Sequence, residues 1–104
     1  MSKFSDLIKN SEIPVLVDFY ADWCGPCKFM EPVLKNVADK LEGKIKIIKV
    51  DVDKNQAAAQ VYKVQGIPTM ILFHKGKILW RQSGAMPEQL LLQHLTPHVP
   101  VSAS

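Results

Sequence analysis

The sequence lacks the features that would assign it to a membrane-bound or nucleic-acid-binding class of protein. None of its apolar runs approaches the roughly 20 residues that a membrane-spanning helix needs. Its 13 basic and 10 acidic residues leave a net charge of only +3, and the basic residues are scattered along the chain. A nucleic-acid-binding domain usually gathers Lys and Arg on one face. We therefore expect neither a membrane nor a nucleic acid as a partner.

Cysteine is also scarce, with only Cys24 and Cys27 in the chain. The first residues, Met1 to Asp6, carry no apolar core of a secretory signal peptide, which favours a cytoplasmic protein. Cytosolic thiols are kept reduced, so a disulfide in that compartment is usually catalytic or redox-sensing. The two cysteines are therefore the first candidates for chemistry.

Length and composition indicate a single domain over residues 1–104, because 47% of the residues are hydrophobic and one core can be built from them. Short runs of β-branched and aromatic residues predict strands at 14–20, 45–52, 69–74 and 77–82. Helical spacing predicts helices after Ser2 as N-cap, from 24 to 41, from 57 to 62 and after Pro87. We expect the tail from about residue 97 to be frayed.

The helices and turns predict how these elements connect. The apolar stripe of the long helix includes Phe29, and Leu90, Leu91 and Leu95 form the core side of the last helix. The strand–helix–strand order predicts that strands 14–20 and 45–52 are parallel. Lys75-Gly76 predicts a hairpin between the last two strands. This pattern is typical of an α/β fold.

The two cysteines flank Gly25-Pro26 at the point where the first strand ends and the long helix begins. This spacing brings both sulfurs into the first helical turn, and it places Cys24 near unpaired backbone N–H groups and the positive end of the helix dipole. Those features stabilise a thiolate, which is the nucleophile of disulfide exchange. Cys24 is therefore the predicted nucleophile, and Cys27 would attack the mixed disulfide that forms.

Three other interpretations of the pair are weaker. A structural zinc site usually has four ligands, but the chain has no third cysteine, and His74, His94 and His98 are distant in sequence. We therefore expect no metal. Inert core cysteines would not explain the Gly-Pro between them at a strand–helix junction. A permanent staple across so short a loop would gain little loop-closure entropy.

The segment from Val17 to Lys28, which reads Val-Asp-Phe-Tyr-Ala-Asp-Trp-Cys-Gly-Pro-Cys-Lys, closely resembles the signature of the thioredoxin family. Similarity continues at Pro32, at Gly66-Ile67-Pro68-Thr69, and at Gly76 and Gly84, and it covers about residues 10 to 95. The resemblance implies a thioredoxin-like three-layer sandwich with a central mixed sheet of four strands flanked by helices. The implied strand order is 45–52, 14–20, 69–74, 77–82, with the hairpin strands antiparallel to the first two.

The resemblance also implies an activity, namely reduction of disulfides in target proteins through a mixed disulfide. Gly-Pro between the cysteines is the version found in reductants of this fold, whereas isomerases and strong oxidants usually carry Gly-His or Pro-His. No bound cofactor is implied beyond the reversible Cys24–Cys27 disulfide. Reducing equivalents would come from NADPH through a flavin-dependent thioredoxin reductase. The implied partners are that reductase and disulfide-containing proteins, and we expect a monomer.

Family resemblance further implies which residues contact a substrate. Trp23 would form the rim of the site, and the Ile67–Pro68 bond would be cis and face the cysteines. The backbone of Ile67 would then be free to pair with an extended substrate segment. The full implied set is Trp23, Gly25, Pro26, Ile67, Pro68 and Gly84.

Asp18 stands out because it lies within the apolar strand 14–20. A buried carboxylate is costly unless it is paired or neutral, so we expect a raised pKa and a role in accepting the proton of Cys27. Lys49 on the neighbouring strand is a candidate partner for Asp18. It is equally compatible with a solvated lysine.

The N-terminus departs from the family, which usually has a further strand before the first helix. We therefore expect strand 45–52 to be an exposed sheet edge, with Lys44, Lys46 and Lys49 guarding it against aggregation. Two other functions stay open. One is a redox-independent subunit of a larger complex, and the other is an oxidase or isomerase of the same fold.

Overall fold

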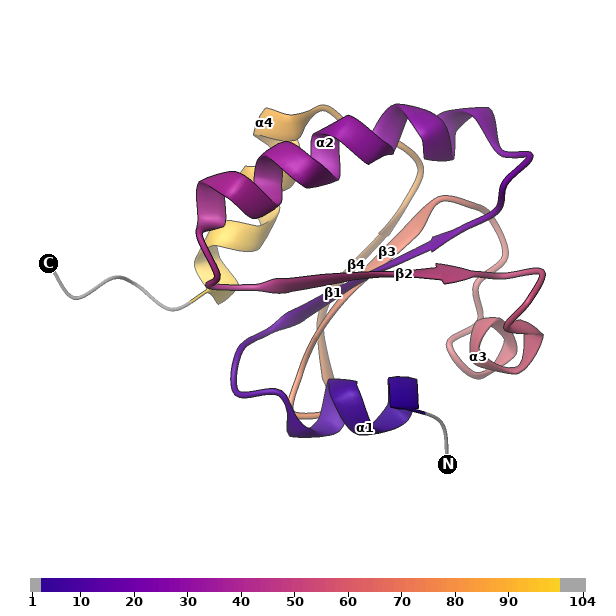
Figure 1. Cartoon of the computed structure of the whole chain (residues 1–104), viewed down its shortest axis with the longest axis horizontal. Helices are drawn as coiled ribbons and strands as arrows, with labels where there is room; N and C mark the ends of the chain where they lie inside the picture. The colour runs from indigo at the N-terminus through magenta and orange to yellow at the C-terminus, as the bar shows by residue number, and fades with distance from the viewer. Residues whose placement is uncertain (1–2, 100–104) are drawn as a thin grey trace, which may run out of the picture.

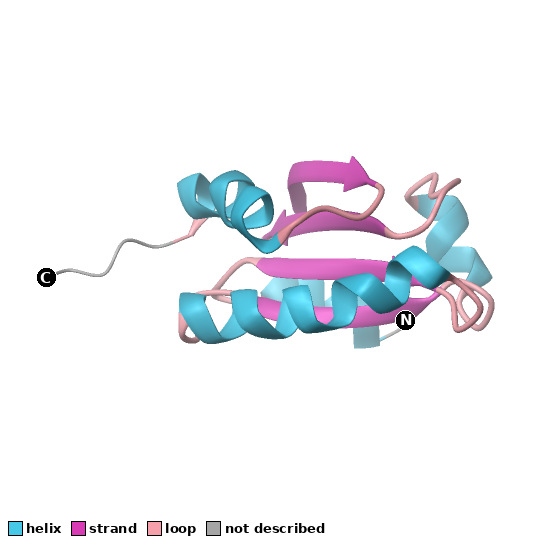
Figure 2. Cartoon of the chain, turned by 90° about the horizontal axis from the view of Figure 1, so that it is seen from above, coloured by secondary structure: helices cyan, strands magenta, loops and turns pink. Residues whose placement is uncertain are grey.

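A computed structural model of the chain describes residues 3–99 and has one four-stranded sheet with helices on both faces (Figures 1 and 2). The strands are β1 (Val15–Tyr20), β2 (Lys46–Asp51), β3 (Thr69–His74) and β4 (Lys77–Ser83). The helices are α1 (Lys3–Asn10), α2 (Gly25–Leu41), α3 (Gln56–Val61) and α4 (Glu88–Leu95), followed by a 3-10 turn at Thr96–His98. Helices α2 and α4 cover one face, and α1 and α3 cover the other (Figure 1). The predicted three-layer sandwich is confirmed, while the expected N-cap Ser2 lies outside the described residues.

The strand order is β2-β1-β3-β4, as predicted. β1 and β2 are parallel, while β3 is antiparallel to both β1 and β4. One expectation was wrong: β4 is not antiparallel to β1. A hairpin reverses the chain, so β4 runs opposite to β3 and therefore in the same direction as β1. Within residues 3–99, β2 forms one edge of the sheet, which confirms the predicted exposed edge.

Two apolar clusters fill the space between the sheet and its helices. Alternate residues of β1 and β3 point to opposite faces, so both strands contribute to both clusters. The cluster under α2 and α4 includes Leu16, Met30, Val37, Leu72, Leu91 and Leu95. The cluster under α1 and α3 includes Ile8, Val17, Phe19, Ile71 and Phe73. Burial on both faces explains why β1 is a continuous apolar run.

Two apolar residues of the helices differ from expectation. Phe29 is 55% exposed and Leu90 is 38% exposed, so neither belongs to the core. The face of each helix that contacts the sheet is narrower than its set of apolar residues. Residues 96–98 form the 3-10 turn, and Val99 packs against the cluster under α2 and α4.

The predicted hairpin has Lys75 and Gly76 at its turn, both with positive φ, at 54° and 83°. The Gly76 N–H donates to the carbonyl of Ile8 at 2.8 Å, which ties α1 to the end of the sheet. Among residues 3–99, no helix combines the length and apolar character that crossing a membrane requires.

Candidate active site

Cys24 lies at the junction of β1 and α2, where it is the N-cap residue of the helix. Its backbone is extended (φ −89°, ψ 111°), and its Sγ accepts a hydrogen bond from the backbone N–H of Cys27 at 3.2 Å. An N-cap acceptor satisfies one of the donors that the first helical turn leaves unpaired. In the reduced protein, the same donor and the helix dipole stabilise a Cys24 thiolate. Pro26 fits the first turn because no helical bond requires its N–H there.

The two cysteines form a disulfide, with their Cα atoms 5.2 Å apart. Cys24 is 4% exposed and Cys27 is 3% exposed, so the two residues are almost equally buried in this oxidised state. Both pack with Ala21, and Tyr20, Val52 and Ile67 complete the apolar surroundings. This environment limits the access of water to the sulfurs.

The loop before β3 faces the disulfide, as predicted. The Ile67–Pro68 peptide bond is cis, and the Ile67 carbonyl oxygen lies 3.8 Å from the Cys24 Sγ. A disulfide sulfur has no proton, so this contact can become a hydrogen bond only in the thiol form. Gly84, which has a φ of 94°, donates its N–H to the Pro68 carbonyl at 2.7 Å. The structure therefore brings Ile67, Pro68 and Gly84 together beside the cysteines.

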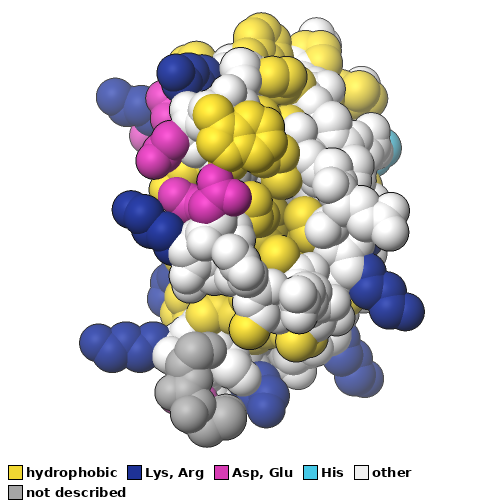
Figure 3. All heavy atoms as spheres, turned by 90° about the vertical axis from the view of Figure 1, so that its right-hand side faces the viewer, with side chains coloured by type: hydrophobic (Ala, Val, Ile, Leu, Met, Phe, Trp, Pro, Cys, Tyr) yellow, Lys and Arg dark blue, Asp and Glu magenta, His cyan; other side chains and the backbone are white. Residues whose placement is uncertain are grey.

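The surface around the disulfide is apolar and open to a partner. Trp23 is 71% exposed, and Gly25 and Pro26 are exposed beside it. Figure 3 looks onto the end of the molecule where α2 begins, and it shows hydrophobic side chains across the middle of that face with acidic side chains to one side. The Trp23 Nε1 donates to Asp53 Oδ2 at 2.9 Å. Sequence reasoning missed Asp53, because no pattern in the sequence identifies the acceptor for an indole N–H.

Asp18 lies on β1, is completely buried, and has no hydrogen-bond partner for either carboxylate oxygen among the described residues. Burial raises its pKa from 3.8 to about 6, the positive charge of Lys49 opposes this rise, and the negative charge of Glu31 adds to it. The predicted burial and raised pKa are confirmed. A carboxyl group that titrates near neutral pH is suited to accepting and releasing a proton.

Lys49 occupies the position on β2 that pairs in register with Asp18. Its ammonium forms an ion pair with Glu31 at 3.2 Å and lies 4.4 Å from the centroid of the Tyr20 ring. Lys49 therefore acts on Asp18 through space and not through a hydrogen bond. Sequence reasoning also missed Glu31, although it follows Cys27 by four residues and such pairs share one side of a helix.

A cysteine pair at a helix N-terminus, facing a cis-proline loop on this α/β sandwich, defines the class of thiol–disulfide oxidoreductases. Within residues 3–99, no group of three or more His, Cys, Asp or Glu side chains is placed to hold a metal ion. The sequence model of the thioredoxin family matches residues 1–97, and the chain belongs to that family.

Relatives and a solved structure agree with this assignment. The chain is 47% identical over 90 residues to thioredoxin 1 of Chlorobaculum tepidum, covering 86% of this chain and 89% of that protein. It is 46% identical over 94 residues to the chloroplastic thioredoxin Y of Oryza sativa subsp. japonica, covering 90% of this chain and 56% of that protein. A solved mutant thioredoxin from Halobacterium salinarum superposes with a TM-score of 0.86 at 36% identity, covering 97% of this chain and 87% of that one.

Family membership and the cysteine pair together establish the activity. The chain is a protein-disulfide oxidoreductase whose redox-active group is the Cys24–Cys27 disulfide. Thioredoxins generally work with a reductase and with disulfide-containing targets.

Proposed function

We propose that the chain works in the reducing direction and donates two electrons to disulfides of target proteins. The observation that supports this most directly is the N-cap position of Cys24, whose sulfur accepts the Cys27 N–H at 3.2 Å. A helix N-terminus stabilises the thiolate and hence the reduced, reactive form of the protein. Gly25-Pro26 between the cysteines agrees with this direction, since it is the dipeptide of reductants that share this fold.

The reaction takes place in two exchange steps. The Cys24 thiolate attacks one sulfur of the target disulfide, forming a mixed disulfide and releasing the other target sulfur as a thiolate. Cys27 then loses its proton and attacks the Cys24 sulfur, which forms the Cys24–Cys27 disulfide and releases the second target thiolate. The target gains two electrons and the dithiol loses two.

The second step requires a group that takes the proton of Cys27. We assign this role to Asp18, because it is buried on the face of the sheet that α2 covers and its pKa is raised to about 6. Proton transfer proceeds directly or through one water. Lys49 is a positioning residue in this scheme, because its charge holds the pKa of Asp18 below the value that burial alone would give.

The target binds as an extended segment across the exposed surface beside the disulfide. The Ile67 backbone pairs with this segment as an added strand would. The apolar side chains around it exclude water during exchange. The residues assigned to this surface are Trp23, Gly25, Pro26, Ile67, Pro68 and Gly84.

For regeneration, we propose a flavin-dependent thioredoxin reductase that delivers electrons from NADPH, and a monomeric protein working in the cytoplasm. A chain with only two cysteines, both used in exchange, suits a compartment that keeps thiols reduced. Fractionation of the source cells with an antibody tests the compartment, and sedimentation tests the monomer.

An insulin-reduction assay with NADPH and a thioredoxin reductase tests the function. The native chain should sustain NADPH oxidation, and Cys24→Ser and Cys27→Ser should each abolish turnover. Cys27→Ser should accumulate the mixed disulfide, whereas Cys24→Ser should not. Absence of turnover in the native chain would remove the proposal, and biological activity that survives Cys24→Ser would favour a redox-independent subunit instead.

A further inference from the structure

The outer edge of β2 is a row of backbone groups that no strand of the described chain covers. The Lys46 N–H donates to the carbonyl of Pro14, just before β1, and the Val52 N–H donates to the carbonyl of Tyr20 in β1. Because the hydrogen-bonding direction alternates along a strand, Ile47 and Lys49 turn their N–H and C=O groups to the other side. The N–H of Asp51 turns the same way, while its C=O accepts from the backbone N–H of Asn55 at 2.9 Å. Such a row is a template for one more strand.

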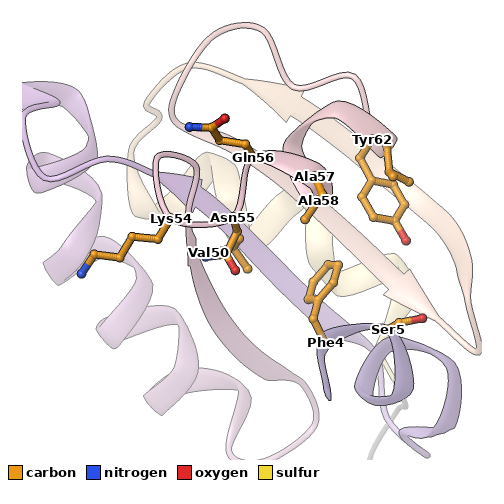
Figure 4. Close-up of a pocket in the computed structure, with 10 residues that line it drawn as sticks. Phe4, Ser5, Val50, Lys54, Asn55, Gln56, Ala57, Ala58 and Tyr62 are labelled. Atoms are coloured by element: carbon orange, nitrogen blue, oxygen red, sulfur yellow. The ribbon is translucent and has the colours of Figure 1, made fainter. Parts of the chain in front are cut away.

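A hollow borders β2 on each face of the sheet. The α3 hollow, of about 440 Å³, lies between α1 and α3 and has apolar walls that include Phe4, Val50 and Tyr62, while Lys54 extends away from them (Figure 4). The α2 hollow, of about 320 Å³, lies on the opposite face and includes Ile47 of β2. Leu34 and Ala38 complete its apolar part, and Glu31, Lys35 and Lys49 its charged part.

The two hollows lie where the side chains of an added strand would point. Successive side chains of a strand alternate between the faces of a sheet. A strand hydrogen-bonded to Ile47, Lys49 and Asp51 would therefore place one side chain toward the α3 hollow and the next toward the α2 hollow. The open backbone edge of β2 and the α3 and α2 hollows together fit an extended peptide segment.

The charges along the β2 edge indicate which kind of extended segment would bind there. Lys44, Lys46 and Lys54 have no ion-pair partner among residues 3–99, and Lys35 has none either. A second copy of the chain would bring the same lysines against one another, which is unfavourable. Acidic side chains at the two ends of an extended segment would instead meet Lys44 and Lys46 at one end of β2 and Lys54 at the other.

We propose that the β2 edge binds an extended acidic segment of a partner protein, which adds a fifth strand and places apolar side chains in the α3 and α2 hollows. Neither hollow includes the cysteines or the loop at Ile67 and Pro68. The α2 hollow does include Lys49 and Glu31, whose charges act on the pKa of Asp18. The docking surface nevertheless lies apart from the cysteines and goes beyond the proposed function. Its attraction is partly electrostatic, so it weakens as salt is added.

The probe is a synthetic peptide, Glu-Glu-Val-Leu-Val-Glu-Glu with blocked ends, titrated into the isotope-labelled chain in its oxidised form. We expect shifts of the backbone amide signals of Ile47, Lys49 and Asp51, together with slower hydrogen exchange at these amides. The same peptide with Lys in place of Glu, and a version methylated at alternate backbone nitrogens, should not bind. Shifts confined to β4 or to the disulfide end, or equal binding of the Lys peptide, would overturn the proposal.

Variants separate this edge from the rest of the surface. Lys44→Glu/Lys46→Glu should bind the peptide roughly tenfold more weakly, and Val61→Asp, at an exposed wall of the α3 hollow, should also weaken binding. Lys9→Glu/Lys77→Glu changes the net charge equally on other elements and should bind as the native chain does. Insulin reduction should be the same in all of them. Unchanged binding by the Lys44→Glu/Lys46→Glu variant, or self-association through β2 in sedimentation, would contradict the proposal.

Discussion

At the scale of single residues, the negative charge of the buried Asp18 opposes folding. Its pKa of about 6 in the folded chain lies above its ordinary value of 3.8. Below the lower value the carboxyl is neutral in both states. As the pH rises from 3.8 to 6, the unfolded chain ionises more readily than the native chain, and the native state is progressively penalised. Above pH 6 the full penalty is present.

Asp18→Asn should therefore stabilise the fold more at neutral pH than in acid. The difference in unfolding free energy between variant and native chain should increase by about 3 kcal/mol between pH 3 and pH 8, which is the size of the pKa shift converted to free energy. Urea unfolding at several pH values measures it. The opposite trend would show that Asp18 is ionised and well paired.

The same variant should react more slowly in the second exchange step. Cys27 would lose its proton acceptor, so the mixed disulfide should persist while the first attack by Cys24 proceeds at its native rate. Stopped-flow fluorescence with a disulfide target separates the two steps. Asp39→Asn, on the exposed side of α2, is the control that should change neither step. A native rate of resolution in Asp18→Asn would exclude the shuttle.

Lys49 and Glu31 should tune the pKa of Asp18 in opposite directions. Lys49→Met removes a positive charge that lowers this pKa, so the pKa should rise. Glu31→Gln removes a negative charge that raises it and also frees Lys49 from its ion pair, so the pKa should fall. Carbon-detected NMR titration of the Asp18 carboxyl measures both shifts. Shifts of the same sign in the two variants would contradict this account.

Some residues of the candidate site could be predicted from the sequence, and others could not. Asp18 was identifiable because a carboxylate within an apolar run conflicts with its neighbours. The cysteines were identifiable because their spacing and their place at a strand–helix junction have a chemical reason. Glu31 and Asp53 were not, because the partner of a long or distant side chain depends on how α2 and the loop after β2 pack in three dimensions.

At the scale of elements, the strands were predictable because burial on both faces leaves a continuous apolar run. Which apolar residues of each helix are buried was less predictable. Phe29 and Leu90 belong to apolar patterns but are exposed, since only the residues that directly face the sheet are covered. The predicted direction of β4 was wrong because two successive reversals, from β1 to β3 and from β3 to β4, leave β4 parallel to β1.

The lysines at the open edge of β2 should protect the chain from aggregation. Lys44→Thr/Lys46→Thr should increase aggregation, because it removes charges that keep the open edge of β2 from pairing with other chains. Light scattering during incubation at high concentration measures this, and the rate of insulin reduction should not change. Lys3→Thr/Lys9→Thr on α1 removes the same charge away from the sheet and serves as the control. Equal aggregation of the two double variants would show that net charge, and not the edge, matters.

At the scale of the whole molecule, the two apolar clusters are joined through the strands they share. β1 gives Leu16 to the cluster under α2 and α4 and Val17 to the cluster under α1 and α3. β3 divides its side chains in the same way, with Leu72 and Ile71. If one layer of helices detached from the sheet, one face of β1 and β3 would be exposed to water. The other layer packs against the opposite face of the same two strands.

This sharing predicts one cooperative unfolding transition, even when either cluster is weakened. Leu91→Ala under α4 and Phe73→Ala under α1 should each cost roughly 2–5 kcal/mol, because both side chains are fully buried. In each variant, fluorescence of Trp80, which packs against the cluster under α2 and α4, should change together with circular dichroism of the whole backbone. A Trp23→Phe background removes the second indole signal. Separate transitions for the two probes would show that the layers unfold independently, in spite of the strands they share.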